Sequence, residues 1–478
     1  WDMGNTEVLL TRATAMDGRI HLPDGMSYAL LHLKPGLDFI SLSVLEKIEE
    51  MVEDGIVLVG DPPRRAAGLA GYPESDEDVR TIAQRLWGEI DGERVYMSTH
   101  GKGRVYAGKT IAEVLDLEAI KPDFSYTADE DVELSYIHRA AEDLEIYYVA
   151  NKWGYKDTSD LQYRFRSDPP DRYVQATCSF RVDGDRQIER FDPVTGAVTP
   201  VLVYERRGGR YEVPVSLAPE GSTFFVFRKG PERRHVTRIT RNGKAVGAGN
   251  APLQLNASGI FVGTGGTEVL LEGTYELAWS DGSTQSLSPT ALPPERTIDG
   301  GWQITFMERP SLGEIVTTET DVLRSWTEFS RREIKYFSGT ARYRKTFDLA
   351  DESGSRGRGS GRRVYLDLGN VLDLVTVRLN GKVVDTCWIA PFRVEITDHL
   401  VKGRNLLELD VTNCWANRLI GDGKLPKERR RTRSNVAGKF QKPGAQEGLR
   451  ASGLLGPVKL QFAAIEPRPG RGDRGRSR

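Results

Sequence analysis

The first 120 residues alternate between short apolar runs and stretches with helical periodicity. Residues 28–33 (YALLHL) and 56–60 (IVLVG) are typical of buried strands, because each is an apolar run of strand length. Residues 41–55 between them predict a helix that begins after a serine cap and ends at a glycine. The positions that support this helix are Val44, Leu45, Ile48, Met51 and Val52, with Ser41 or Ser43 as the cap and Gly55 as the stop.

The same alternation continues to about residue 117. The pattern predicts a second helix over residues 76–88, a strand over 103–108 and a third helix over 110–117. Strands that alternate with helices are typical of a mostly parallel sheet covered by helices. We therefore predict an α/β domain over residues 1–128, of a kind that can carry a nucleotide or amidotransferase site.

From about residue 130 the helical periodicity ends, and short alternating strands separated by turn residues replace it. This pattern predicts an antiparallel β-sandwich over residues 129–230 and a β-rich connecting segment over 231–297. The predicted strands of the sandwich are 132–140, 144–151, 173–182, 199–206, 211–218 and 222–229.

A further β region is predicted over residues 298–464, where six alternating strands and a tight turn at Asn380-Gly381 indicate a jelly-roll-like sandwich. At its end, residues 411–422 (VTNCWANRLIGD) are predicted as a strand that runs into a loop. The insertion at 353–363 is predicted to be a flexible loop, and residues 465–478 a disordered arginine-rich tail. For this tail we favour a solvated state over contact with nucleic acid.

Composition and charge narrow the classes of function. The 66 basic residues nearly balance the 68 acidic ones, and the net charge of −2 provides no overall attraction for nucleic acid or anionic lipid. The longest apolar runs are far shorter than the roughly 20 residues that span a bilayer. We therefore predict no nucleic-acid partner and no membrane span. Three cysteines lack the close pairs of a zinc site or disulfide framework: Cys178, Cys387 and Cys414.

Motifs for phosphate binding and nucleophilic catalysis are absent from the predicted α/β domain. No G-x-G-x-x-G or G-x-x-x-x-G-K-[ST] sequence opens a helix there. The turn GRVYAGKT has Lys109 and Thr110 where a nucleophile elbow would hold Ser or Cys. The chain also lacks eight βα units and a D-x-[DN]-x-[DN]-G loop. Catalytic residues and metal ligands are therefore left unassigned, and no cofactor is identified from the residues.

His138 and Arg139 are candidates for the edge of a site. They lie on a predicted strand near Glu142 and Asp143, and a histidine beside carboxylates can carry a proton because its pKa is easily tuned. The alternative, which we favour, is a hydrogen bond within the β-domain or across a seam between domains. His100 is interpreted in the same way.

Aromatic and amide side chains in the predicted jelly roll suit carbohydrate binding. Aromatic rings stack on the apolar faces of sugars, while amides and arginine bind hydroxyl groups. In the alternative interpretation the tryptophans fill the sandwich core, which we favour for Trp388, and the asparagines set turns. The candidates are Trp388, Asn413, Trp415, Asn417 and Arg418, with Phe392 beside them.

Several stretches resemble glycoside hydrolases. FSGTARY at 337–343, LNGK at 379–382 and VTNCWANRLIGD at 411–422 lie in a region similar to the sugar-binding-like, or galactose-binding-like, domain of glycoside hydrolase family 2. Together with LPDGMSYALLHL, IHRAAEDLEIYYVAN and FDPVTGAV nearer the front, they resemble glycoside hydrolase family 106, the α-L-rhamnosidase-type enzymes. The resemblance covers nearly the whole chain.

The resemblance implies a parent enzyme that hydrolyses α-L-rhamnosyl linkages in plant-type polysaccharides, with two catalytic glutamates on an upstream (β/α)8 barrel. The chain starts at Trp1 without an initiator Met or signal-peptide pattern, so we expect it to be the non-barrel portion of that enzyme. Its partners would be the barrel and a rhamnose-containing polysaccharide or oligosaccharide. The resemblance also implies an amidotransferase-like first domain, a secreted or periplasmic parent, and calcium in that parent. The alternatives are a stand-alone carbohydrate-binding module or a purely structural module.

Overall fold

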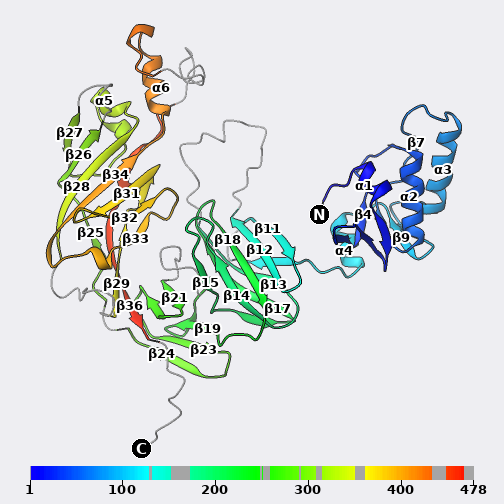
Figure 1. The fold of residues 1–478 in the computed structure, drawn as a ribbon, viewed down its shortest axis with the longest axis horizontal. Helices are drawn as coiled ribbons and strands as arrows, with labels where there is room; N and C mark the ends of the chain where they lie inside the picture. The colour runs from blue at the N-terminus through cyan, green and yellow to red at the C-terminus, as the bar shows by residue number, and fades with distance from the viewer. Residues whose placement is uncertain are drawn as a thin grey trace, which may run out of the picture. The chain divides into compact units, whose positions relative to one another are not determined.

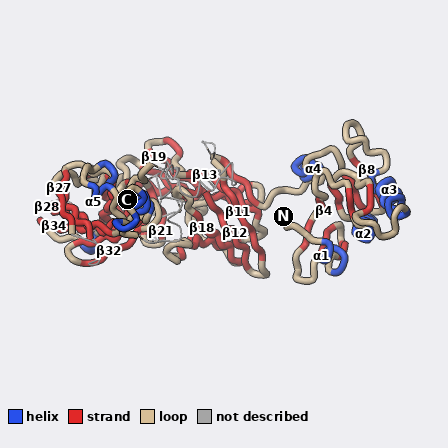
Figure 2. The backbone as a smooth tube through the Cα atoms, turned by 90° about the horizontal axis from the view of Figure 1, so that it is seen from above, coloured by secondary structure: helices blue, strands red, loops and turns tan. Residues whose placement is uncertain are grey.

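The computed structural model describes residues 2–128, 132–151, 173–247, 250, 259–289, 292–307, 315–349, 361–432 and 448–467. The chain divides into two compact units, Trp1–Pro122 and Asp123–Arg478. Helices are concentrated in the first unit and strands dominate the second (Figures 1 and 2). This confirms the predicted β-rich, multidomain class. None of the described helices is long and apolar enough to cross a bilayer.

The first unit contains a four-stranded sheet with the order β4-β6-β9-β8 and flanking helices. Strands β4, β6 and β9 are parallel, and β8 pairs antiparallel with β9. The predicted strand-helix-strand unit is confirmed, because α2 connects β4 to β6 and buries the apolar stripe that includes Leu45 and Ile48. The elements are α1 (Thr6–Thr11), β1 (Thr14–Met16), β2 (Arg19–His21), β3 (Ser27–Tyr28), β4 (Leu30–His32), β5 (Phe39–Ile40), α2 (Leu42–Glu53), β6 (Val57–Val59), β7 (Arg65–Ala66), α3 (Glu74–Trp87), β8 (Met97–His100), β9 (Gly103–Tyr106) and α4 (Ile111–Leu117).

The second unit begins with two antiparallel sheets, of order β10-β13-β17-β16 and β11-β12-β18-β14-β15. We call this pair the first sandwich. Residues from both sheets share one core, because alternate side chains of each strand point inward. The two sheets thus form an antiparallel sandwich that begins at β10, before the predicted start at residue 129. Its strands are β10 (Phe124–Thr127), β11 (Leu134–Ala140), β12 (Leu144–Asn151), β13 (Val174–Arg181), β14 (Arg186–Phe191), β15 (Val198–Pro200), β16 (Glu205–Arg207), β17 (Arg210–Leu217) and β18 (Ser222–Lys229).

The next segment contributes to two different sheets. One is a small sheet of order β20-β19-β23-β24, while β21 and β22 join the sheet of β36 near the end of the chain. Strand pairing thus crosses the predicted boundary between 231–297 and 298–464. The strands are β19 (Val236–Arg241), β20 (Lys244–Ala245), β21 (Ile260–Gly263), β22 (Gly266–Val269), β23 (Tyr275–Trp279) and β24 (Thr284–Leu287).

The rest of the unit is a second sandwich, built from the sheets β27-β26-β28-β34-β31-β32 and β21-β22-β36-β29-β33, with β25 also paired to β36. Its core is shared by both sheets and contains the fully buried Trp302 and Trp326. The elements are β25 (Arg296–Thr297), β26 (Trp302–Met307), β27 (Val316–Thr320), η3 (Trp326–Glu328), α5 (Arg332–Lys335), β28 (Thr340–Leu349), β29 (Arg362–Asp367), β30 (Asn370–Leu372), β31 (Leu374–Leu379), β32 (Lys382–Cys387), β33 (Arg393–Glu395), η5 (Thr397–His399), β34 (Gly403–Thr412), α6 (Ala416–Gly423), η6 (Lys427–Arg429), β35 (Gly453–Gly456) and β36 (Lys459–Glu466).

The predicted loop after β34 is wrong, because residues Ala416–Gly423 form helix α6. The alternating pattern ends at Thr412, and Ala416, Leu419 and Ile420 then recur at the spacing of one helical face, which is buried. Of the predicted flexible insertion and disordered tail, residues 353–360 and 468–478 lie outside the described residues. The start of the predicted tail is ordered, because β36 extends to Glu466.

Candidate functional site

His138 lies between two carboxylates of the first sandwich. Its Nδ1 is 3.2 Å from Oδ2 of Asp123, and its Nε2 is 3.0 Å from Oε2 of Glu145. The ring stacks on Tyr147 with centroids 4.1 Å apart. Burial alone lowers the pKa of His138, but the hydrogen bonds to both carboxylates outweigh it and raise the pKa to about 9. Glu142 and Asp143, the predicted neighbours, are not these partners. A protonated histidine that forms two ion pairs and stacks on a tyrosine is better suited to stabilising the fold than to carrying a proton.

Arg139, the other residue of this predicted site edge, lies on the exposed side of β11. Its Nη1 donates a hydrogen bond to the backbone carbonyl of His138 at 3.1 Å. The structure therefore places the two residues next to each other without bringing the guanidinium into the carboxylate pair.

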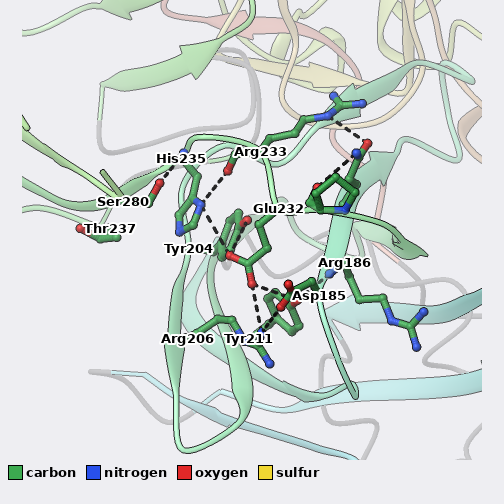
Figure 3. Close-up of polar contacts among 12 residues, drawn as sticks. Asp185, Arg186, Tyr204, Arg206, Tyr211, Glu232, Arg233, His235, Thr237 and Ser280 are labelled. Atoms are coloured by element: carbon green, nitrogen blue, oxygen red, sulfur yellow. Dashed lines mark hydrogen bonds and ion pairs between the residues drawn. The ribbon is translucent and has the colours of Figure 1, made fainter. Parts of the chain in front are cut away.

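A second polar cluster links the first sandwich to β19 (Figure 3). The carboxylate of Glu232 accepts hydrogen bonds from the hydroxyls of Tyr204 at 3.4 Å and Tyr211 at 3.3 Å. The ring of His235 stacks on Tyr204 at 3.6 Å, and its Nδ1 donates to the carbonyl of Arg233 at 2.9 Å. Burial lowers the pKa of His235, which favours the neutral ring. Because these groups satisfy one another, we interpret the cluster as a clamp that fixes the path into β19.

The two asparagines of the predicted sugar set are buried. Asn413 accepts a hydrogen bond from the backbone nitrogen of Gly339 and donates one to the carbonyl of Phe337, both at 2.9 Å. Asn417 donates to the carbonyl of Arg450 at 2.7 Å and accepts from its nitrogen at 2.8 Å. Both side-chain amides thus bind backbone groups near α6. This agrees with the alternative interpretation, in which the two asparagines set turns.

The two tryptophans of the set are exposed, 58% for Trp388 and 64% for Trp415. The core position favoured for Trp388 is therefore wrong, because the chain leaves the sheet at Cys387, one residue before it. Strands β32 and β34 both pair antiparallel with β31, so Trp388 and Trp415 follow strands that end at the same edge of the sheet. Arg418 lies on α6, where its backbone nitrogen donates to the hydroxyl of Ser338 at 3.2 Å.

Trp388 lines a cleft of about 700 Å³ between the two sandwiches of the second unit. We call it the Trp388 cleft. One wall comes from the β14–β15 hairpin and the turn between β17 and β18, and the other from residues 384–395. The polar side chains that line it include Arg190, Asp192, Asp385 and Glu395. Trp415, Asn413 and Asn417 are not among its lining residues.

The cleft has a buried cation on one wall and an exposed carboxylate on the other. Arg190 is 4% exposed and pairs with Asp192 at 3.3 Å. Burial lowers the pKa of Arg190, and the charge of Asp192 opposes this shift. On the opposite wall, Asp385 is exposed, and its Oδ1 accepts a hydrogen bond from the nitrogen of Thr386 at 2.7 Å. The arrangement offers donors and acceptors for sugar hydroxyls beside an aromatic face.

The thiol of Cys387 also lines the cleft but is not suited to act as a nucleophile. Burial and the nearby Asp385 raise its pKa to about 12, so it stays protonated near neutral pH. The three cysteines are free, as their wide spacing in the sequence suggested.

A smaller cavity of about 490 Å³ adjoins the Trp388 cleft, because Thr199 and Glu395 line both. Its lining includes Glu268, whose two oxygens accept hydrogen bonds from Arg363 at 2.6 Å and from the hydroxyl of Tyr365 at 2.9 Å. Burial raises the pKa of Glu268, and the charge of Arg363 opposes the shift. Since both oxygens are held by side chains of one strand, β29, we interpret Glu268 as part of the sheet rather than as a free acid.

The described residues contain no group of three or more His, Cys, Asp or Glu side chains arranged to hold a metal ion. The described residues therefore offer no carboxylate cluster of this kind for the calcium implied in a parent enzyme.

Comparison with known proteins finds a family similarity in the front part of the chain. Residues 1–206 match the model of the α-L-rhamnosidases of glycoside hydrolase family 106. The match covers less than half of the chain, which is therefore similar to family 106 over these residues. The family 106 assignment agrees with the structure of a rhamnosidase from Novosphingobium sp. PP1Y, which is 28% identical with a TM-score of 0.62 over 96% of this chain and 35% of that chain. The family consists of carbohydrate-active enzymes, as the sequence predicted.

Two other similarities are weaker. A putative beta-glucuronidase from Formosa agariphila is 23% identical over 93% of this chain and 51% of its own length. The chain therefore spans about half the length of this curated relative. The beta-glucuronidase of Ruminococcus gnavus covers 37% of this chain and 30% of its own, with 18% identity and a TM-score of 0.26. That similarity is too low to support the family 2-type assignment of the second sandwich, which stays a prediction.

Proposed function

We propose that this chain forms the non-barrel portion of a glycoside hydrolase that cleaves α-L-rhamnosyl linkages in plant-type polysaccharides, and that the Trp388 cleft holds part of the carbohydrate. In this proposal residues 1–128 are an amidotransferase-like domain, and the second sandwich is a galactose-binding-like jelly roll. The upstream barrel is the catalytic partner. The observation that carries the proposal is an exposed tryptophan on a polar cleft in a chain that is similar to a rhamnosidase over 96% of its length.

The chemistry of the cleft suits a neutral sugar. The exposed indole of Trp388 provides an apolar face for the C–H side of a pyranose ring. Asp385 and Glu395 accept hydrogen bonds from hydroxyl groups, and Arg190 donates them. We assign no catalytic carboxylate pair among these residues, so the role of the cleft is to bind and orient carbohydrate rather than to break the bond.

Trp388→Ala is expected to weaken binding of a neutral rhamnose-containing oligosaccharide about tenfold, since aromatic stacking contributes about 1.5 kcal/mol. Isothermal titration of the wild type and the variant measures the effect. The matched control is Tyr72→Ala, which removes a similarly exposed aromatic side chain of the first unit, outside the cleft, and is expected to leave affinity unchanged. Equal affinity of the wild type and Trp388→Ala would remove the cleft from the proposal.

The non-barrel assignment has a separate test. Incubation of this chain with a chromogenic α-L-rhamnoside is expected to give no turnover, and strong turnover by this chain alone would contradict the assignment. Binding without any stimulation of a separately expressed barrel would favour the alternative of a stand-alone carbohydrate-binding module.

A further inference from the structure

We propose that the end of the second sandwich around α5, α6 and η6 binds the anionic groups of an acidic polysaccharide. We call this surface the basic face. Residues 331–335 and 418–432 contain nine lysines and arginines and three acidic residues, although the whole chain has a net charge of −2. The inference does not rest on the proposed rhamnosidase function, because it concerns charge that lies outside the Trp388 cleft. The basic residues are Arg331, Arg332, Lys335, Arg418, Lys424, Lys427, Arg429, Arg430 and Arg431.

Close packing on Tyr336 brings α5 and α6 together, and the two helices lie side by side (Figure 1). Gly421 allows this approach, because a Cβ atom there would lie 2.7 Å from Cγ of Tyr336. The Nζ of Lys424 donates to the hydroxyl of Tyr336 at 3.3 Å and lies 5.4 Å from its ring centroid. The guanidinium of Arg332 lies 5.5 Å from the same centroid. One ring thus positions cations from two helices.

The η6 segment is tied to the same surface. The carboxylate of Asp422, which is 2% exposed, accepts a hydrogen bond from the backbone nitrogen of Thr432 at 2.7 Å. The pKa of Glu333 on α5 is lowered first by its own backbone N–H and then by the charges of Arg331 and Arg431. Arg431 therefore lies close enough to α5 for its charge to act there. Two of the three acidic residues are already engaged. Asp422 is buried and binds the backbone nitrogen of Thr432, and Oε2 of Glu333 lies 3.4 Å from Nε of Arg331.

The exposed side chains of the basic face favour a sugar polyanion. Six of the nine cations are exposed, and the 64% exposed Trp415 directly precedes α6. Carboxylates form strong charge-assisted hydrogen bonds with arginine, and an indole can stack on the pyranose ring that carries them. Nucleic acid presents phosphates that the same cations could bind, but a duplex keeps its bases stacked inside the helix, where the exposed indole of Trp415 cannot stack on them. The surface thus fits a uronic-acid polysaccharide better. The exposed cations are Arg331, Arg332, Lys424, Lys427, Arg429 and Arg431.

The test compares the wild type with a variant that carries Arg332→Glu, Lys424→Glu, Lys427→Glu and Arg429→Glu. Binding to polygalacturonate, neutral dextran and duplex DNA is measured by affinity electrophoresis and by titration at two salt concentrations. We expect the wild type to bind polygalacturonate in a salt-dependent manner and the variant to bind it at least about tenfold more weakly, since several phosphate- or carboxylate-type contacts are lost. Dextran should not be retarded by either protein.

A matched control reverses the same number of exposed charges in the first unit, with Lys34→Glu, Arg94→Glu, Lys102→Glu and Lys121→Glu. Its affinity for polygalacturonate should stay within about twofold of the wild type, because the net charge changes but the basic face does not. Equal weakening in both variants would overturn the proposal, as would DNA binding as tight as polygalacturonate binding. Glutamine replacements at the same four positions of the basic face provide a second variant in case the glutamates impair folding, and the same loss is expected.

Discussion

Replacing Trp326 by alanine is expected to lower the free energy of unfolding of the second unit by about 3–5 kcal/mol, as for other buried aromatic residues. Trp326 is 0% exposed in the core of the second sandwich. Its ring packs edge-on against Phe306 and Phe337, with centroids 5.4 and 5.5 Å away. Its Nε1 donates to the hydroxyl of Tyr343 at 2.6 Å, so alanine leaves both a cavity and a buried hydroxyl without this donor. Urea titration followed by tryptophan fluorescence and circular dichroism measures the loss.

The matched control is the same substitution at Trp388. Because 58% of its surface is already exposed, Trp388→Ala is expected to change the free energy of unfolding by no more than about 0.5 kcal/mol. The two variants therefore separate a core tryptophan from a tryptophan that is available to a ligand. Comparable losses at both positions would contradict the placement of Trp388 on an open cleft.

Local periodicity was sufficient to predict most of the fold. The helix over residues 41–55 was placed correctly because its apolar residues follow one helical face, and Leu45 and Ile48 are indeed buried. The turn at Asn380-Gly381 was predicted from its dipeptide, and both residues have positive φ, 52° and 80°, as a type I′ turn requires. In both cases the signal lies within a few residues of the chain, where sequence alone can be interpreted.

The candidate site could be predicted only in part, because it depends on contacts between distant segments. Trp388 was proposed for sugar binding, but the wall that faces it comes from Arg190 and Asp192, nearly 200 positions earlier. Asp385 was missed although DTCW places it three residues before Trp388, a spacing that could have drawn attention to it. For His138, the nearest acidic residues in sequence were proposed as neighbours, whereas Asp123 is brought to it by the fold.

The overlooked helix α6 has a different cause. It is short, it follows a strand directly, and two glycines lie near its end, which lowers its intrinsic helix propensity. Tertiary contacts stabilise it instead, through the buried side chain of Asn417 and the packing of Gly421 against Tyr336. Such contacts leave no local signal, so the sequence pattern alone favoured a loop.

Raising the pH from 7 to 10 is expected to remove about 2.5 kcal/mol of stability from the second unit through His138, at 1.36 kcal/mol for each unit of pKa difference. The pKa of His138 is about 9 in the folded protein, above its ordinary value of 6.5. A raised pKa means that the folded state holds the proton more tightly than the unfolded state. The stabilisation is therefore complete below pH 6.5 and is lost as the pH rises through 9. Free energies of unfolding measured at intervals between pH 6 and pH 10 should follow this decline.

His138→Gln is expected to abolish this alkaline decline and to be about as stable as the deprotonated wild type, because glutamine hydrogen-bonds without a charge. The stability of the second unit at acidic pH gives an independent test, through Asp123. The hydrogen bond from His138 lowers the pKa of Asp123; burial opposes this shift and Arg181 reinforces it. The contribution of Asp123 to the free energy of unfolding is therefore present above its ordinary pKa and is lost as the pH falls through its lowered pKa. The control is His100→Gln in the first unit, where the ring lies 3.8 Å from Glu49 and the slope of the second unit should not change. An alkaline decline that persists in His138→Gln would show that other groups carry it, and the ion-pair role of Asp123 and Glu145 would have to be abandoned.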